Sequence, residues 1–185
     1  MKIVKLQNFK ENDSFEKFSS WLQKDLNQVN KIILETLETD SSLITELSNY
    51  IIGAGGKRIR PLLTLATAKL CQYSGYRHLS LASTIEFIHT ATLLHDDVVD
   101  GSKKRRGKKT ANFIWGNKPS ILVGDFLLSK AFKILINDGS LKCIDIISSV
   151  SEKISFGEVK QLMSVGNSNI SESDYLEIIG YKTAE

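Results

Sequence analysis

The sequence predicts an all-α protein. Its 185 residues are 42% hydrophobic and 24% charged, a balance that suits one globular domain with a sizeable core. Apolar residues recur at helical spacing, as in Phe15, Phe18 and Leu22, and alternating runs of β-branched residues are few. The two prolines, Pro61 and Pro119, each open an apolar stretch, where the first turn of a helix tolerates proline.

The expected helices follow from this spacing and from the breaks between apolar stretches. Ser74-Gly75 ends the third helix, and the polar loop Gly101–Lys109 follows the fourth. Ser171 and Asp174 have the spacing of a capping box, which starts the last helix. The expected helices occupy about residues 14–38, 41–53, 61–73, 79–100, 119–136, 140–165 and 171–185.

No internal repeat or shift in composition marks a second domain, so we expect residues 1–185 to form a single all-α domain. The last helix has a start signal, yet the chain reaches Glu185 with no glycine, proline or polar tail. The sequence therefore looks cut inside an element.

Composition excludes several classes of protein. Cys71 and Cys143 lie far apart, which excludes a disulfide scaffold and a Cys-x-x-Cys site. No apolar run approaches the ~18 residues of a membrane span, and residues 1–18 lack the apolar core of a signal peptide. The expected location is cytoplasmic. The net charge of +3 is too small to imply nucleic-acid binding by itself.

Acidic side chains gather on one face of the helix expected at 79–100. Positions four or seven apart nearly eclipse on a helix, so His89, Asp96 and Asp100 share one stripe, with Asp97 beside them. Like charges at this spacing repel, and the helix macrodipole disfavours anions at a C-terminus. Converging carboxylates suit Mg²⁺, which takes one or two of them together with substrate phosphates. The alternative is a solvated acidic helix end.

Basic residues lie on either side of this helix in the sequence. Arg105 and Arg106 belong to a basic loop that follows the aspartates, and guanidinium groups bind phosphate as a planar fork. The segment 53–61 adds Lys57 and Arg60, with glycines that let the backbone approach a ligand closely. A small phosphorylated ligand, bridged by Mg²⁺ to the aspartates, would satisfy both charge clusters. The alternatives are a solvated basic face and a simple helix cap at the glycines.

Taken together, these segments resemble the trans-prenyltransferases, the polyprenyl diphosphate synthase family, and point to its long-chain, octaprenyl kind. The match follows the family's order over nearly the whole chain beyond the first expected helix. The residues that carry it are Gly55–Pro61 (GGKRIRP), Glu86–Asp100 (EFIHTATLLHDDVVD), Arg105–Gly107, Gly124-Asp125, Gly157-Glu158 with Gln161, and Lys182-Thr183.

The resemblance implies a helical bundle around a deep central cavity. It also implies a Mg²⁺-dependent transferase that joins isopentenyl diphosphate to an allylic diphosphate, with no protein nucleophile. It assigns to isopentenyl diphosphate the residues Lys57, Arg60, His89 and Arg106. It assigns to the allylic diphosphate Arg105, Gln161, Lys182 and Thr183, and to the metal Asp96, Asp97 and Asp100. His89 has a purely structural role as its alternative.

Other residues of the matched segments have less specific expected roles. His78 and His95 are expected to be structural, and Asp125 to be either a buried hydrogen-bonding residue or a ligand. The resemblance places Ala91 and Thr92, both small, in the pocket that limits product length, which implies a long product for quinone side chains. Helix geometry places Thr92 near the metal stripe but gives no such position to Ala91.

The chain departs from the family in ending before its second aspartate-rich motif. We therefore expect the N-terminal portion of such an enzyme, with little activity alone, and a homodimer or a complementing C-terminal half as partner. A non-catalytic subunit that binds diphosphate or an intact synthase is an alternative. A terpene cyclase and a nucleic-acid binder using Lys103 to Lys109 are others, although we expect no nucleic acid as partner.

Overall fold

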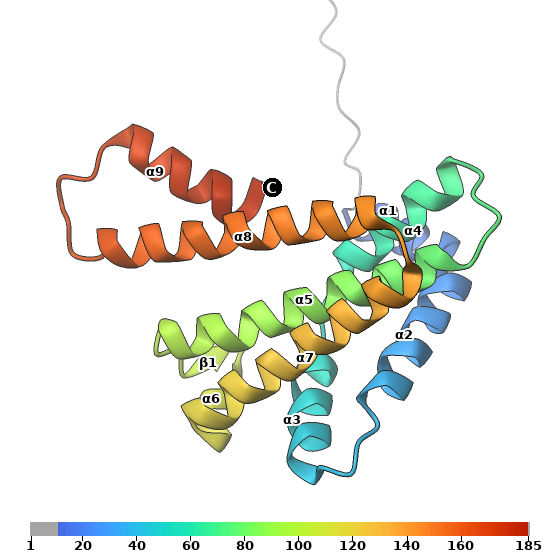
Figure 1. Ribbon diagram of the computed structural model, residues 1–185, viewed down its shortest axis with the longest axis horizontal. Coiled ribbons are helices and arrows are strands. Elements are labelled where there is room, and N and C mark those ends of the chain that lie inside the picture. The colour runs from blue at the N-terminus through green and yellow to red at the C-terminus, as the bar shows by residue number, and fades with distance from the viewer. Residues whose placement is uncertain (1–10, 185) are drawn as a thin grey trace, which may run out of the picture. The chain divides into compact units, whose positions relative to one another are not determined.

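The computed structural model describes the backbone of residues 11–184 and the side chains of residues 14–183. It confirms the all-α prediction, with one short two-stranded ribbon added (Figure 1). The helices are α1 (Glu11–Trp21), α2 (Gln23–Leu37), α3 (Ser42–Gly53), α4 (Ile59–Leu70), α5 (Arg77–Val99), α6 (Ala111–Trp115), α7 (Asn117–Asp138), α8 (Leu141–Ser164) and α9 (Glu172–Ile179). The ribbon pairs β1 (Lys104–Arg105) with β2 (Lys108–Lys109), and a π-helical turn, η1 (Gly180–Ala184), follows α9.

The chain divides into two compact units, one ending at Asp138 and the other beginning at Gly139. We call them the N-terminal unit and the C-terminal unit and describe each by itself. The expectation of a single domain over residues 1–185 stays a prediction.

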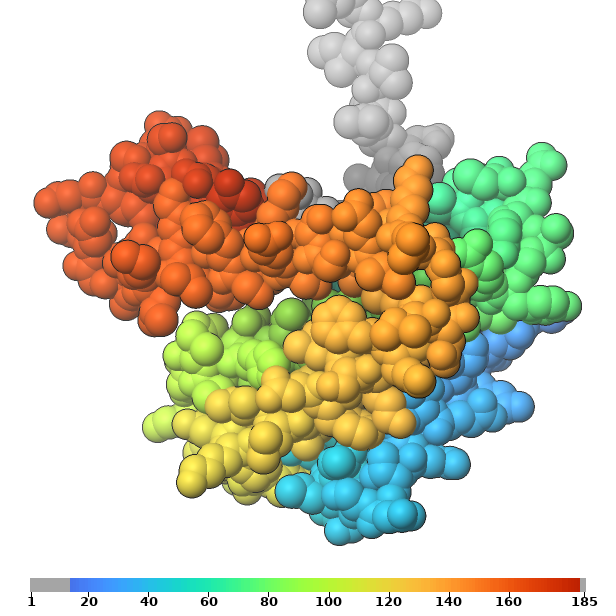
Figure 2. All heavy atoms as spheres, in the orientation of Figure 1, coloured from blue at the N-terminus to red at the C-terminus, as the bar shows by residue number. Residues whose placement is uncertain are grey.

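Helices α5 and α7 form the centre of the N-terminal unit. They lie side by side, and their atoms meet directly in the space-filling view (Figures 1 and 2). They run antiparallel, because Arg77 at the start of α5 makes two hydrogen bonds of 2.7 Å to Asp138 at the end of α7. On α7, Leu127, Ala131 and Leu135 recur every four residues and are fully buried. Helices α2 and α4 also pack against α5.

The predicted helix over 14–38 is wrong in one respect, because it breaks at Leu22. This residue leaves helical geometry, with φ −106° and ψ 2°, and its side chain is buried. The carbonyl of Trp21, which ends α1, accepts a hydrogen bond of 3.0 Å from Lys69 Nζ. A contact 48 residues away therefore stabilises a break that the local apolar spacing does not signal.

The loop predicted at 101–109 contains the β1–β2 ribbon, and α6 is an additional short helix. Arg106 and Gly107, at the turn, both have positive φ. Tyr50 on α3 donates a hydrogen bond of 2.6 Å to the Lys109 carbonyl, and its ring packs edge-on against Trp115. The ribbon is thus tied to the helices on which it lies.

In the C-terminal unit, α9 and η1 fold back on α8. Ser171 caps α9 as its sequence predicts, because its hydroxyl accepts a hydrogen bond of 3.1 Å from the Asp174 amide. A Cβ at Gly157 on α8 would lie 2.8 Å from Tyr181 Cβ, so glycine is needed for η1 to approach this closely. Along the described residues, no helix is both long and apolar enough to cross a membrane.

Candidate active site

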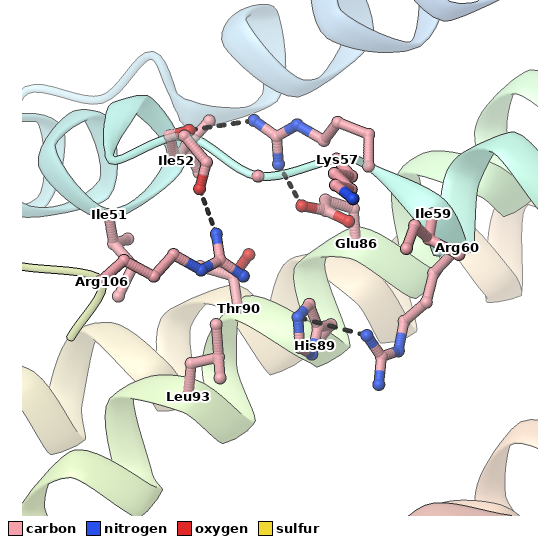
Figure 3. Close-up of a pocket in the computed structure, with 13 residues that line it drawn as sticks. Ile51, Ile52, Lys57, Ile59, Arg60, Glu86, His89, Thr90, Leu93 and Arg106 are labelled. Atoms are coloured by element: carbon pink, nitrogen blue, oxygen red, sulfur yellow. Dashed lines mark hydrogen bonds and ion pairs between the residues drawn. The ribbon is translucent and has the colours of Figure 1, made fainter. Parts of the chain in front are cut away.

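A pocket of about 530 Å³ opens among α3, the α3–α4 turn, α4, α5 and the tip of the ribbon (Figure 3). Its charged lining is strongly basic. The residues that line it are Ile51, Ile52, Gly55, Gly56, Lys57, Arg58, Ile59, Arg60, Glu86, His89, Thr90, Leu93 and Arg106.

The four residues assigned from the sequence to one diphosphate all line this pocket. Lys57 lies in the α3–α4 turn, with its Nζ 5.3 Å from the centre of the Phe15 ring. Arg60 lies in the first turn of α4, and its Nη1 lies 3.4 Å from His89 Nε2 on α5. Arg106 reaches in from the ribbon and donates a hydrogen bond to the Gly55 carbonyl (Figure 3). Three cations and one imidazole from separate segments therefore converge on one cavity.

The electrostatic environment keeps His89 neutral. Burial, together with the nearby positive charges of Arg60 and Arg106, lowers the pKa of His89 from 6.5 to about 4. At neutral pH, Nε2 is then free to accept a hydrogen bond from the Arg60 guanidinium. An anion bound in the pocket would oppose the effect of the arginines and raise this pKa.

Glycine 56 makes room for the guanidinium of Arg106. A Cβ at this position would lie 2.7 Å from Arg106 Nη1. The sequence predicts that this glycine allows close approach of a ligand or caps a helix, and the structure shows that it also allows the ribbon tip to reach the turn.

The sequence predicts no specific role for two of the lining residues, Arg58 and Glu86. Arg58 precedes α4 with a left-handed backbone, at φ 49° and ψ 36°. Its guanidinium donates to the Glu86 carboxylate and, at 3.0 Å, to the Ile52 carbonyl. For Glu86, the sequence offers one indication of a place in the pocket. It lies three residues before His89 and therefore on the same face of a helix.

The aspartates at the end of α5 do not share one role. Helix α5 is continuous to Val99, and the Asp100 amide donates to the Asp96 carbonyl at 2.8 Å, so Asp96 and Asp100 stay four apart on one helical face. Asp97 is buried instead and binds Arg105, with Arg105 Nε and Nη2 at 3.0 and 2.9 Å from Asp97 Oδ1. The Asn112 side chain donates to the Asp97 carbonyl at 2.9 Å, which ties this end of α5 to α6.

The fit of a metal to this region rests on Asp96 and Asp100. Among the described residues, no three His, Cys, Asp or Glu side chains gather closely enough to hold a metal by themselves. Two carboxylates on one face match Mg²⁺, which takes one or two carboxylates and fills its other positions with water and phosphate oxygens. Arg105, predicted to bind the allylic diphosphate, is held here by Asp97.

Next to the aspartates, His95 contacts α7 at a glycine. Its Nε2 lies 3.3 Å from both the Ile121 carbonyl and Asp125 Oδ1. A Cβ at Gly124 would lie 2.7 Å from His95 Cδ2, so the ring occupies the space that the glycine leaves. Asp125 is exposed, with 59% of its side chain accessible, which corrects the expectation that it could be buried. Residue 125 faces solvent because Gly124 is the position that points towards α5.

The two residues predicted to limit product length, Ala91 and Thr92, occupy different environments. Ala91 is fully buried in the core of the N-terminal unit. Thr92 is half-buried, and its hydroxyl donates to the His89 carbonyl at 2.8 Å. Their role in chain length stays a prediction.

The C-terminal unit brings together two of its three predicted site residues. Lys182 Nζ in η1 donates to Gln161 Oε1 on α8 at 2.8 Å and lies 2.7 Å from Glu158 Oε1. Thr183 is exposed. The sequence predicts no role for Glu158, although its spacing of three from Gln161 places both side chains on one helical face.

Solved structures of the same architecture are available for comparison. A decaprenyl diphosphate synthase from Rhodobacter capsulatus matches with a TM-score of 0.88 and 45% identity, over 92% of this chain and 53% of that one. A polyprenyl synthase from Caulobacter crescentus CB15, complexed with calcium and isoprenyl diphosphate, also gives a TM-score of 0.88 at 45% identity, over 91% of this chain and 51% of that one. The fold is therefore that of the isoprenoid synthases.

Sequence comparison agrees with the structural match. Octaprenyl diphosphate synthase of Escherichia coli (strain K12) is 47% identical over 171 residues, which are 92% of this chain and 53% of that protein. The polyprenyl synthetase family model matches residues 41–185. The chain belongs to the polyprenyl synthetase family and is similar to its long-chain members. It spans about half the length of the curated relatives it matches.

Proposed function

We propose that this protein acts in the condensation of isopentenyl diphosphate with an allylic diphosphate to make a long-chain polyprenyl diphosphate, a precursor of quinone side chains. The observation that carries the proposal is the convergence of Lys57, Arg60, His89 and Arg106 on one pocket. Such a basic pocket suits the diphosphate of isopentenyl diphosphate, since guanidinium groups bind phosphate oxygens through paired hydrogen bonds.

Each side chain of the pocket has a distinct task in this proposal. Arg60 and Arg106 present planar forks to the phosphate oxygens, and Lys57 adds a mobile point charge. Neutral His89 accepts from Arg60 through Nε2 and so keeps its proton on Nδ1 as a hydrogen-bond donor. These groups orient isopentenyl diphosphate without forming a covalent bond to it.

Asp96 and Asp100 would hold Mg²⁺ beside the allylic substrate. When bound, Mg²⁺ offsets the negative charge that the leaving diphosphate gains as the allylic C–O bond ionises. Arg105 and Lys182 are the proposed cationic partners of that diphosphate, with Gln161 and Thr183 as supporting polar contacts. Asp97 is proposed near the metal as well, although its side chain binds Arg105 in this structure.

Isothermal titration calorimetry with isopentenyl diphosphate tests the pocket assignment directly. We expect the wild-type chain to bind and Arg60→Gln to bind at least tenfold more weakly. The matched control is Lys31→Gln, which removes one positive charge at an exposed ion pair with Glu35. Equal losses in both variants would show that overall charge, and not this pocket, binds the ligand.

Catalysis requires a separate readout, because binding alone is compatible with a non-catalytic subunit. Incubation with Mg²⁺, radiolabelled isopentenyl diphosphate and farnesyl diphosphate, followed by chromatography of the products, measures condensation. Labelled polyprenyl products that disappear in Asp96→Asn would support the proposed reaction. Formation of the same products by Asp96→Asn at the wild-type rate would contradict the role of this carboxylate.

A further inference from the structure

Three cations, Lys57 and Arg58 in the α3–α4 turn and Arg60 in the first turn of α4, make different contacts in the structure. Lys57 and Arg60 both line the pocket; among the described residues, the Lys57 ammonium lies over the Phe15 ring and the Arg60 guanidinium faces the neutral imidazole of His89. Arg58 lies between them in the sequence, yet both of its terminal nitrogens already donate hydrogen bonds to protein acceptors. The middle cation of the motif therefore has a different task from its neighbours.

The partner of Arg58 is unexpected in an anion-binding pocket. Of the described residues that line it, Glu86 is the one acid, and only 9% of its side chain is exposed. A lone carboxylate here would repel a diphosphate. Paired with Arg58, whose side chain is 19% exposed, it forms a neutral unit instead. Its second tie, from Arg58 Nη2 to the Ile52 carbonyl at 3.0 Å, reaches the end of α3 (Figure 3).

The backbone at Arg58 shows why such a unit is needed. Its φ of 49° is left-handed, a conformation that non-glycine residues adopt only where the surroundings hold them. This conformation turns the chain from α3 into α4 and thereby sets the directions of Lys57, one residue before, and Arg60, two residues after. The buried ion pair and the Ile52 contact hold the residue in place.

We propose that Arg58 is a positioning residue. Held by Glu86 and the Ile52 carbonyl, it fixes the α3–α4 turn so that Lys57 and Arg60 face the ligand, and it does not itself bind the diphosphate. The inference rests on the proposed function in taking isopentenyl diphosphate as the ligand of this pocket.

Substitution by lysine separates positioning from charge. Arg58→Lys keeps the positive charge, but a single ammonium on a flexible stem cannot reproduce the planar fork that bonds Glu86 and Ile52 together. If Arg58 positions the turn, isopentenyl diphosphate should bind at least tenfold more weakly to Arg58→Lys than to wild type, as measured by calorimetry. A direct charge contact to the ligand predicts affinity within twofold of wild type.

The matched control makes the same chemical change at a second buried carboxylate. Arg77→Lys weakens the pair with Asp138, which joins α5 to α7 and does not line the pocket. We expect Arg77→Lys to lower the thermal unfolding midpoint and leave ligand affinity unchanged. Both variants are compared well below their unfolding midpoints, so that lost affinity does not reflect unfolded protein.

A second measurement needs no ligand and therefore separates this inference from the proposed function. NMR titration of the three histidine rings reports the pKa of His89, which the nearby Arg60 charge helps to lower. If Arg58 positions Arg60, Arg58→Lys lets Arg60 move away and the pKa of His89 rises towards 6.5. Arg77→Lys leaves it unchanged.

The outcomes divide cleanly. Weaker binding together with a raised His89 pKa in Arg58→Lys supports the inference, and wild-type behaviour in either readout overturns it. If the wild-type chain does not bind isopentenyl diphosphate, the proposed function fails, and the His89 titration alone decides whether Arg58 positions the turn.

If Arg58→Lys does not fold, the double variant Arg58→Met with Glu86→Met replaces it, because this change leaves the net charge unaltered and removes the ion pair. Wild-type affinity for isopentenyl diphosphate in that variant would likewise overturn the inference.

Discussion

Replacement of Asp97 by asparagine tests whether this aspartate supports the fold or binds the metal. Only 2% of the Asp97 side chain is exposed, and its carboxylate accepts three contacts of 2.9 to 3.2 Å from Arg105. Asparagine keeps the shape but removes the charge and turns one acceptor into a donor that faces the guanidinium. Breaking a fully buried ion pair costs about 3–5 kcal/mol. Because 34% of the Arg105 side chain is exposed and can regain water, we expect Asp97→Asn to lower the free energy of unfolding by about 2 kcal/mol.

Urea denaturation followed by tryptophan fluorescence measures this loss. Both tryptophans, Trp21 and Trp115, lie in the N-terminal unit, so the signal reports the unit that contains Asp97. The experiment is run in EDTA and again in Mg²⁺. If the ion pair is structural, Asp97→Asn should show the full loss of unfolding free energy given above even in EDTA. A double-mutant cycle with Arg105→Met should then give a coupling energy of about 1–2 kcal/mol. A loss below about 0.5 kcal/mol in EDTA would refute the structural role, since it lies within the range of ordinary surface substitutions.

Three further predictions use the same protein. Gly56→Ala should leave stability within about 0.5 kcal/mol of wild type, because the new methyl meets only the mobile end of Arg106, yet it should weaken isopentenyl diphosphate binding severalfold in calorimetry. Gly124→Ala should lower the free energy of unfolding, measured by urea denaturation, by about 1–3 kcal/mol, because the methyl forces the His95 ring away from α7. Gly53→Ala is the control for both, since a Cβ there meets nothing within 4 Å, and an equal effect in Gly53→Ala would contradict both arguments. Lowering the pH from 7 to 5 should reduce stability by about 1 kcal/mol more in wild type than in His89→Gln, after allowance for solvent screening of a half-buried ring. The sign follows because the pKa of His89 is about 4 in the folded protein and 6.5 when unfolded, so the unfolded chain takes up the proton first as the pH falls. Identical pH dependence in both proteins would show that His89 titrates normally.

The pocket residues show which groupings of side chains could be predicted from the sequence. Lys57, Arg60, His89 and Arg106 were assigned to one ligand by family resemblance, and the structure places all four around one cavity. The spacing of Asp96 and Asp100 also predicted a shared face, because a continuous helix repeats closely every four residues. These two groupings rest on a matched motif and on short-range geometry, and the ligand assigned to each stays a prediction.

The partners of individual charges were not predictable in this way. Asp97 differs from Asp96 by one position, which on a helix turns its side chain about 100° towards the ribbon and Arg105. Arg58 and Arg60 look equivalent in the sequence, yet one binds Glu86, 28 residues away, and the other faces His89. The break at Leu22 likewise depends on Lys69, which packs on Trp21.

The sequence by itself determined the helical class, the family and the set of charges available to bind a diphosphate. These properties depend on residues within a few turns of one another or on motifs read in order along the chain. Only the tertiary structure decided which charges neutralise one another and which remain to face a ligand. Arg106 and Gly55 are 51 residues apart, and their contact exists because the ribbon is tied to α3, the helix that leads into the turn with Gly55. Periodicity carries no information about such pairs, since the strength of an ion pair depends on distance and burial in space.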